Sequence, residues 1–263
     1  FVQQIRESVP NVDTVDNPDW NLVLETEQLI TIFNTFSVEE QQTISKWVIE
    51  LTEGMCEFVA KNDDIVGVRI QSIEELDQYC YFVAGTVGHM IIDLLDNAYD
   101  IPYNMYSYDQ VHHLAEEYGL MLQYINITKD VYDDFYSEDN IYIPETIITD
   151  FDLSQSEFVT GDHEKTEEII ELVNERTEAY LESSEEFLQW IQENHADAYR
   201  GWAIPHFLAV ATLRELRKKA DLAIEPEEVK INRTEVQTIL EKIDTTGITE
   251  LRDEIFAEKT VSQ

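Results

Sequence analysis

The sequence predicts an all-α protein that forms a single domain. Apolar residues recur with the 3.6-residue period of a helix along most of the chain, and no long stretch shows the alternation of a half-buried strand. The 263 residues are 43% hydrophobic and 11% aromatic, with only 8 Gly and 6 Pro, which is enough apolar material for a large core. We find no internal repeat or low-complexity linker, so one domain is expected to cover residues 1–263.

Polar and capping signals delimit the expected helices. The helical pattern is interrupted at residue 18, 62–64, 100–102 and 137–144. Ser37 precedes Glu40, and Ser72 precedes Glu75, by the spacing of a capping box, which marks two helix starts. The expected helices cover residues 22–35, 38–61, 73–98, 109–136, 163–193, 196–220, 233–244 and 249–258.

The charge of the chain excludes several classes of partner. It carries 55 Asp+Glu against 17 Lys+Arg, a formal net charge of −38. No basic surface for nucleic acid can be built from so few cations, and an anionic membrane would repel the protein. Molar salt would screen the self-repulsion, so we interpret the chain as a cytoplasmic protein of an extreme halophile, with an ordinary acidic protein as the alternative.

Other features agree with that interpretation. No run is long enough to span a bilayer, so no transmembrane anchor is expected. Cys56 and Cys80 fall in helical patterns and are expected to be reduced core thiols. The oligomeric state is left open.

One polar stripe stands out on the helix expected at 109–136. Gln123, Asn126, Asp130 and Asp134 step by three, four and four residues, so they share one face between apolar neighbours. Carboxylates one turn apart can share a Mg²⁺ ion, and the ion can hold a phosphate. From these residues alone, a magnesium site and a chance arrangement of polar residues explain the stripe about equally well.

The acidic spacing alone has little value in so acidic a chain. With about a fifth of residues acidic, three acids at i, i+3 and i+4 should arise by chance roughly twice here. Two such sets lie on faces crowded with other acids and are expected to be solvated surface: Glu164, Glu167 and Glu168, and Glu182, Glu185 and Glu186. The uncharged amides of the 123–134 stripe distinguish it from both.

Three further segments carry weaker signals. The run Asp13-Thr-Val-Asp16-Asn17 could supply a facing acidic cluster, or simply stop a helix. The glycines of the Val83-Ala-Gly85-Thr-Val-Gly88 stretch indicate close helix packing or room for a ligand. In the 196–220 helix, Pro205 is expected to cause a kink and free a carbonyl, and His206 is expected to be a core residue rather than a metal ligand.

In this order, these segments resemble the squalene/phytoene synthase family. Gln123-Tyr-Ile-Asn126-Ile-Thr-Lys129-Asp130-Val-Tyr-Asp133-Asp134 is similar to its second aspartate-rich motif, and Asp13–Asn17 to its first. Tyr79-Cys-Tyr-Phe-Val83-Ala-Gly85-Thr-Val-Gly88 resembles its Tyr-Cys-x-x-Val-Ala-Gly-x-Val-Gly signature. The Ala203-Ile-Pro stretch and Val229-Lys230-Ile-Asn232-Arg233 resemble the squalene-forming branch.

The resemblance implies an isoprenoid-synthase-type helical bundle around a central apolar cavity. It implies a farnesyltransferase that joins two farnesyl diphosphates head to head through presqualene diphosphate, with reduction by NADPH to squalene. The alternatives are a phytoene or dehydrosqualene synthase without the reduction, and a non-catalytic helical scaffold. A peripheral membrane contact for the lipid product is left open.

The same resemblance implies the roles of individual residues. The Mg²⁺ ligands are Asp13, Asp16, Asn17, Asp130, Asp133 and Asp134. The catalytic group is Tyr79, together with Asp13, Asp130 and Asp134. The substrate contacts are Gln123, Asn126, Lys129, Val83 and Gly85. The cofactor contacts are Lys230 and Arg233.

Several positions depart from the family pattern. Asn17 stands where the first motif usually ends in Asp, Pro10 where an Arg usually precedes that motif, and Asn232 where the basic segment has Arg. The upstream Ser-Arg-x-Phe-type helix has no counterpart, so one or more N-terminal helices are expected to be missing. An inactive homologue is therefore a further possibility.

Overall fold

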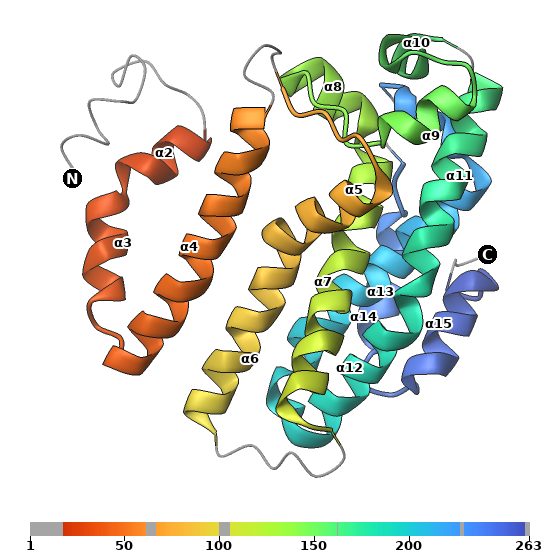
Figure 1. Ribbon diagram of the computed structural model, residues 1–263. Helices are drawn as coiled ribbons and strands as arrows, with labels where there is room; N and C mark the ends of the chain where they lie inside the picture. The colour runs from red at the N-terminus through yellow and green to blue at the C-terminus, as the bar shows by residue number, and fades with distance from the viewer. Residues whose placement is uncertain (1–17, 62–66, 100–105, 162, 227–228, 261–263) are drawn as a thin grey trace. The chain divides into compact units, whose positions relative to one another are not determined.

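The computed structural model of the protein describes residues 18–61, 67–99, 106–161, 163–226 and 229–260, and these residues are mainly helical (Figure 1). The elements are α2 (Pro18–Leu24), α3 (Thr26–Phe33), α4 (Val38–Lys61), α5 (Ile73–Cys80), η1 (Tyr81–Gly85), α6 (Thr86–Ala98), α7 (Tyr108–Lys129), α8 (Val131–Glu138), α9 (Glu145–Asp150), α10 (Gln155–Thr160), α11 (His163–Ala179), α12 (Leu181–Asn194), α13 (Ala196–Lys218), η2 (Ala220–Ile224), α14 (Arg233–Lys242) and α15 (Ile248–Phe256). The described ranges contain no strand, only an isolated parallel bridge between Arg69 and Ile141. The all-α prediction is confirmed.

The chain divides into two compact units, residues 1–46 and 47–263. The described part of the first unit holds α2, α3 and the start of α4. The predicted capping box begins α4: the Ser37 N–H donates to the Glu40 carboxylate at 2.7 Å, and the Glu40 N–H donates to the Ser37 hydroxyl at 3.2 Å. That one domain covers the whole chain stays a prediction.

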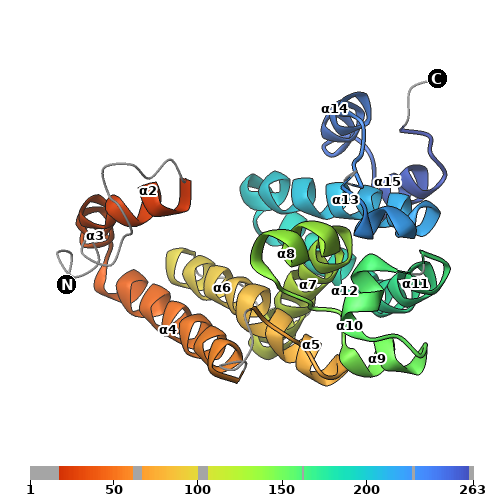
Figure 2. The same ribbon diagram turned by 90° about the horizontal axis from the view of Figure 1, so that it is seen from above.

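Helix α7 is the central element of the second unit. It packs against η1 and α6 on one side and against α11, α12 and α13 on the other (Figure 2). A Cβ atom on Gly88 would lie 2.4 Å from the Ala115 carbonyl oxygen, and one on Gly119 would lie 2.6 Å from the Ala84 carbonyl oxygen. These glycines therefore let the backbones of η1, α6 and α7 come into contact. Close helix packing, one of the two explanations that the sequence offered for the glycines of this stretch, is thus present.

Several expected helices are subdivided. The stretch 73–98 is helical throughout, but it contains the π-helix η1. The stretch 109–136 breaks at Asp130, and 163–193 breaks at Tyr180. The short helices α9 and α10 were not predicted, although α10 begins with a capping box. Their six-residue lengths are too short for a hydrophobic period to show.

Helix α13 continues through Pro205. The Tyr118 hydroxyl on α7 donates to the Trp202 carbonyl at 2.6 Å, which joins the two helices near the proline. His206 is fully buried, and burial lowers its pKa to about 3, so it is a neutral core residue as predicted.

The two cysteines differ in their surroundings. Both are free, and Cys80 is buried as predicted. Cys56 is exposed, so the expectation that it is a core thiol is wrong. In the part of the chain that the structure describes, no helix has the length and apolar character needed to cross a membrane.

Candidate functional site

The acidic motif lies at the junction of α7 and α8. Asp130 has φ −102° and ψ 17°, which ends α7 and starts α8, while the Asp134 N–H still donates to the Asp130 carbonyl at 2.8 Å. Asp130 and Asp134 are half-buried, whereas Asp133 is exposed. The Lys129 ammonium lies 2.6 Å from an Asp130 carboxylate oxygen. The motif is thus a turn between two helices, not the middle of one.

The junction concentrates negative charge around one carboxyl group. Burial, followed by the charges of Asp130, Glu138 and Asp133, raises the pKa of Asp134 to about 7, against a smaller opposing effect of Lys129. Such a group is only about half ionised at neutral pH, and a bound cation would favour its charged form. This charge balance fits a Mg²⁺ ion, whose preferred ligands are carboxylate oxygens.

A network of hydrogen bonds joins the end of α8 to the segment that precedes α5. Arg69 is buried, and its guanidinium donates to the Asp139 carbonyl and, at 2.8 Å, to the Asp139 carboxylate. The Val68 N–H donates to the Asn140 side-chain oxygen at 2.7 Å. Gly67 has φ +87°, and a Cβ there would lie 2.0 Å from the Asp139 carbonyl oxygen. Only glycine allows so close an approach.

Two tyrosines adjoin the acidic junction. The ring centroids of Tyr79 and Tyr142 are 4.8 Å apart, with the ring planes tilted by 32°. Phe58 of α4 packs edge-on against Tyr79 at 5.3 Å. Burial, then the hydrogen bond to Tyr142, raises the pKa of Tyr79, and the charge of Asp134 adds to that effect. Both tyrosines are therefore neutral proton donors with apolar ring faces.

Tyr142 was absent from the predicted site residues. Its signal was faint, a single tyrosine in the Ile141-Tyr-Ile143-Pro144 run that follows α8. Its ring packs against that of Tyr79, 63 positions earlier in the chain, and no local pattern reveals that long-range contact.

The other predicted substrate contacts lie on α7 and η1. Gln123 is half-buried and Asn126 is exposed, both on the helix that leads to Asp130. Val83 is half-buried in the π-helix. A Cβ on Gly85 would lie 3.1 Å from the Glu116 side chain, so this glycine faces α7. Their roles as substrate contacts stay predictions.

The predicted first acidic cluster cannot be compared with this geometry, because Asp13, Asp16 and Asn17 lie outside the described residues. Among the residues that are described, no group of three or more His, Cys, Asp or Glu side chains is arranged to hold a metal ion. That Asp130, Asp133 and Asp134 bind Mg²⁺ therefore stays a prediction, and Asp130 and Asp134 alone would not complete such a site.

The two predicted cofactor contacts flank the start of α14. Lys230 and Arg233 are exposed. Between them, the Asn232 side-chain oxygen accepts a hydrogen bond from the Glu235 N–H at 2.8 Å and caps the helix. The roles of Lys230 and Arg233 as cofactor contacts stay predictions.

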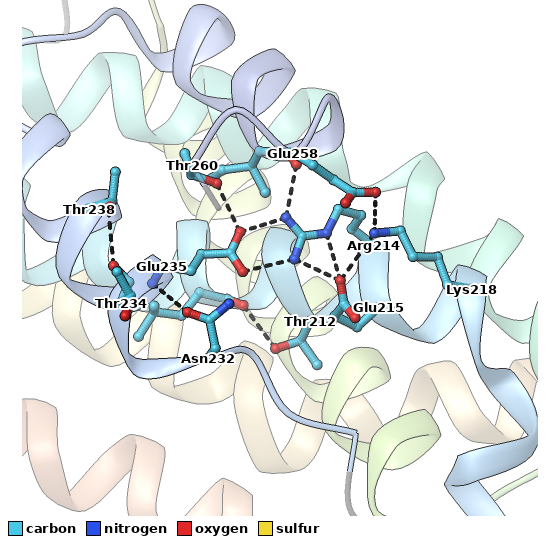
Figure 3. Close-up of polar contacts among 12 residues, drawn as sticks. Thr212, Arg214, Glu215, Lys218, Asn232, Thr234, Glu235, Thr238, Glu258 and Thr260 are labelled. Carbon is cyan, nitrogen blue, oxygen red and sulfur yellow. Dashed lines mark hydrogen bonds and ion pairs between the residues drawn. The ribbon is translucent and has the colours of Figure 1, made fainter. Parts of the chain in front are cut away.

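A buried ion pair anchors the same segment (Figure 3). The Arg214 guanidinium on α13 donates to both Glu235 carboxylate oxygens, at 2.5 and 2.9 Å, and to the Ile255 carbonyl at 3.0 Å. The Thr260 hydroxyl donates to Glu235 at 2.8 Å. Burial alone would raise the pKa of Glu235, but these hydrogen bonds hold it below its usual range. The pair joins α13, α14 and the end of the chain.

The two other acidic sets differ from each other. On α11, Glu164 and Glu168 are exposed, as expected of solvated surface, whereas Glu167 is half-buried. Glu185 on α12 is half-buried, and the Arg252 guanidinium lies 2.9 Å from it. The expectation of a purely solvated face is wrong for this second set.

Comparison with known sequences identifies the protein class. The sequence profile of the squalene/phytoene synthase family matches residues 3–235. The chain belongs to this family.

Relatives include both kinds of enzyme in the family name. The squalene synthase of Schizosaccharomyces pombe is 25% identical over 250 residues, which are 93% of this chain and 51% of that protein. The squalene synthase of Saccharomyces cerevisiae is 25% identical over 200 residues, 75% of this chain and 43% of that protein. A chloroplastic phytoene synthase of Narcissus pseudonarcissus is 28% identical over 129 residues, 49% of this chain and 30% of that protein. The chain spans about half the length, or less, of these relatives.

Solved structures share the fold. TcSQS bound to the ligand E5700 superposes with a TM-score of 0.80 at 20% identity, over 94% of this chain and 70% of that one. A dehydrosqualene synthase in complex with a ligand gives a TM-score of 0.55 at 19% identity, over 99% of this chain and 77% of that one. The helical architecture is thus that of an isoprenoid synthase.

Proposed function

We propose that the protein catalyses the Mg²⁺-dependent head-to-head condensation of two farnesyl diphosphates through presqualene diphosphate, followed by reduction with NADPH to squalene. The observation that carries the proposal is the acidic junction of Asp130 and Asp134, where Asp134 lies near enough to the Tyr79–Tyr142 pair for its charge to raise the pKa of both tyrosines. This arrangement combines a site for a phosphate-bound cation with aromatic faces suited to a carbocation.

The acidic junction would bind the diphosphate leaving group through Mg²⁺. Asp130 and Asp134 would hold Mg²⁺, with Asp13 and Asp16 of the first motif as its remaining carboxylate ligands. Bound Mg²⁺ supplies positive charge that neutralises a departing diphosphate. Lys129, beside Asp130, would donate a hydrogen bond to a phosphate oxygen. A free diphosphate is repelled by a chain of net charge −38, so binding should depend strictly on the cation.

The two tyrosines would stabilise the carbocation that forms on the substrate. The ring faces of Tyr79 and Tyr142 can stabilise an allylic cation. Because burial keeps both hydroxyls protonated, they donate hydrogen bonds rather than act as bases. Phe58 packs against Tyr79 and helps to exclude water, which would otherwise quench the cation.

The reduction step would use the basic segment at the start of α14. Lys230 and Arg233 would meet the phosphates of NADPH, whose nicotinamide supplies a hydride. Asn232 replaces a cation of the family segment and is engaged in the α14 cap. That observation favours a second candidate, a dehydrosqualene or phytoene synthase that stops before reduction.

Product analysis separates these candidates. The full-length protein is incubated with farnesyl diphosphate and Mg²⁺ in molar KCl, with and without NADPH, and the lipids are identified by mass spectrometry. Squalene that appears only with NADPH supports the proposal. Dehydrosqualene under both conditions, or phytoene from geranylgeranyl diphosphate, supports the second candidate. Absence of any diphosphate release would indicate a helical scaffold without activity.

A further inference from the structure

The Asp77 carboxylate on α5 accepts hydrogen bonds from three side chains outside that helix. The Tyr124 hydroxyl of α7 donates to its Oδ1 atom at 2.5 Å, and the hydroxyl of Tyr180, which lies between α11 and α12, donates to the same atom at 3.0 Å. The Arg176 guanidinium of α11 donates to its Oδ2 atom at 2.6 Å. Asp77 therefore connects α5 to α7 and to the end of α11.

The three donors are themselves constrained by packing. Tyr124 and Tyr180 are both buried, and their ring centroids lie 5.8 Å apart. The Arg176 guanidinium carbon lies 5.6 Å from the centroid of the Tyr180 ring, in a cation–π contact. Burial, followed by the hydrogen bond to Asp77, raises the pKa of Tyr124, so its hydroxyl stays a donor at neutral pH. The position that the Asp77 carboxylate must occupy is therefore well defined.

Asp77 is not itself suited to the chemistry of the acidic junction. Each of its oxygens already accepts a hydrogen bond, and Arg176 supplies the positive charge that balances the carboxylate. Asp77 also belongs to no group of three or more His, Cys, Asp or Glu side chains, among those that the structure describes, that could hold a metal ion. Its contribution is to join helices.

Tyr79 leaves α5 on the side opposite to Asp77. An α-helix turns by about 100° per residue, so side chains two positions apart point about 200° apart around the axis. On this opposite side, the Tyr79 ring packs against Phe58 of α4 and against Tyr142, which follows α8. The hydrogen bonds of Asp77 therefore fix the rotation of α5 from the side that faces away from Tyr79.

We infer that Asp77 is a positioning residue, whose three hydrogen bonds set the direction in which α5 presents the Tyr79 ring. The inference rests on the proposed function, in which that ring faces an allylic cation. Helix α5 has only eight residues and runs directly into the π-helix η1. A helix of this length is not stable by itself, so tertiary contacts must determine its orientation.

A small rotation of α5 is enough to affect the reaction. Side-chain tips lie about 5–6 Å from a helix axis, so a rotation of about 10° moves them by about 1 Å. A displacement of about 1 Å can lower a rate by about a hundredfold. Because the Tyr79 ring would act on the cation and not on the diphosphate, the loss should appear in kcat, with little change in the KM for farnesyl diphosphate.

Two variants of nearly unchanged shape test this expectation. Asp77→Asn removes the charge that Arg176 binds, and Tyr124→Phe removes one donor. Tyr106→Phe is the matched control, because the Tyr106 hydroxyl donates to the Glu186 carboxylate at 2.9 Å, away from α5. Diphosphate release is measured with the full-length protein, farnesyl diphosphate and Mg²⁺ in molar KCl, and kcat is expressed per folded protein.

For Asp77→Asn, kcat should fall about 10- to 100-fold, while KM changes by less than about twofold. Tyr124→Phe should show a smaller loss of the same kind, and Tyr106→Phe should match the wild type. If Asp77→Asn does not fold, Tyr124→Phe provides the same comparison. A wild-type kcat in the folded variants, or an equal loss in Tyr106→Phe, would overturn the inference.

A double-mutant cycle tests whether Asp77 acts through Tyr79. In a Tyr79→Leu background, which lacks the ring, Asp77→Asn should lower kcat by less than about twofold. The full 10- to 100-fold loss in that background would show that Asp77 acts independently of Tyr79, and the inference would be wrong.

Tyrosine-selective ¹³C NMR provides a measurement that needs no turnover. The Tyr79 signal is assigned by its absence in Tyr79→Leu. It should shift in Asp77→Asn and Tyr124→Phe, and stay in place in Tyr106→Phe. An unchanged Tyr79 signal in Asp77→Asn would overturn the inference. The expected shifts in a wild-type background that releases no diphosphate would instead overturn the proposed function and support the positioning of Tyr79 by Asp77.

Discussion

Replacing Asp134 by Asn is expected to stabilise the metal-free protein and abolish its activity. The pKa of Asp134 is raised from 3.8 to about 7, chiefly by burial, so the folded state favours its protonated form. A shift of this size corresponds to about 4 kcal/mol between the two protonation states. Because the side chain is half-buried, solvent screens the effect, and we expect a gain of about 1–2 kcal/mol in the variant.

The difference in stability between the variant and the wild type is expected to depend on pH. Between about pH 4 and about pH 7 the folded wild type binds a proton that the unfolded chain has released, so its stability falls as pH rises. The asparagine variant lacks this loss. Its advantage should therefore be largest above about pH 7 and disappear near pH 4.

The assay is denaturant unfolding at about pH 8, with and without Mg²⁺, in constant molar KCl. Without Mg²⁺ the variant should be the more stable protein, and added Mg²⁺ should stabilise the wild type more than the variant. Glu168→Ala, on the exposed face of α11, is the matched control and should change neither value. A variant less stable than the wild type without metal, or equal stabilisation of both by Mg²⁺, would refute the reasoning.

Three further outcomes are expected. Gly88→Ala should destabilise the protein by about 2–4 kcal/mol, because the new Cβ would lie 2.4 Å from the Ala115 carbonyl oxygen, whereas Gly201→Ala, with nothing within 4 Å, should be neutral or slightly stabilising in the same melt. Glu235→Leu should cost about 3–5 kcal/mol by removing the buried carboxylate that accepts two hydrogen bonds from Arg214, and the double variant with Arg214→Met should recover much of that loss in chemical unfolding. The melting temperature should rise between about 0.1 M and 3 M KCl, and equal values would contradict the halophilic interpretation.

Local patterns in the sequence were sufficient for most helices. The stretch at 38–61 matches α4, because its capping box and apolar period both lie within the segment. The break at Asp130 could not be predicted in this way, since Asp-Val-Tyr-Asp is compatible with a continuous helix. Tertiary contacts such as the hydrogen bond from Arg69 to Asp139 fix the opposite end of α8, and they too cannot be read from the local sequence.

The same limit applies to the site. Among 55 acidic residues, composition cannot show which carboxylates turn inward. Asp77, for example, accepts hydrogen bonds from Tyr124, Arg176 and Tyr180, which lie 47, 99 and 103 positions away along the chain. The position of Tyr142 opposite Tyr79 depends on a similarly distant pairing. Asp130 and Asp134 were identified by their uncharged neighbours, not by their charge.

The most direct test of the proposed site is Mg²⁺-dependent release of diphosphate from farnesyl diphosphate. It is measured in molar KCl for the wild type, Asp130→Asn, Asp134→Asn and Glu168→Ala. We predict release by the wild type and Glu168→Ala only, and only with Mg²⁺. Release that persists in both aspartate variants, or that is lost equally in Glu168→Ala, would contradict the assignment of Asp130 and Asp134 as the magnesium ligands that bind the leaving group.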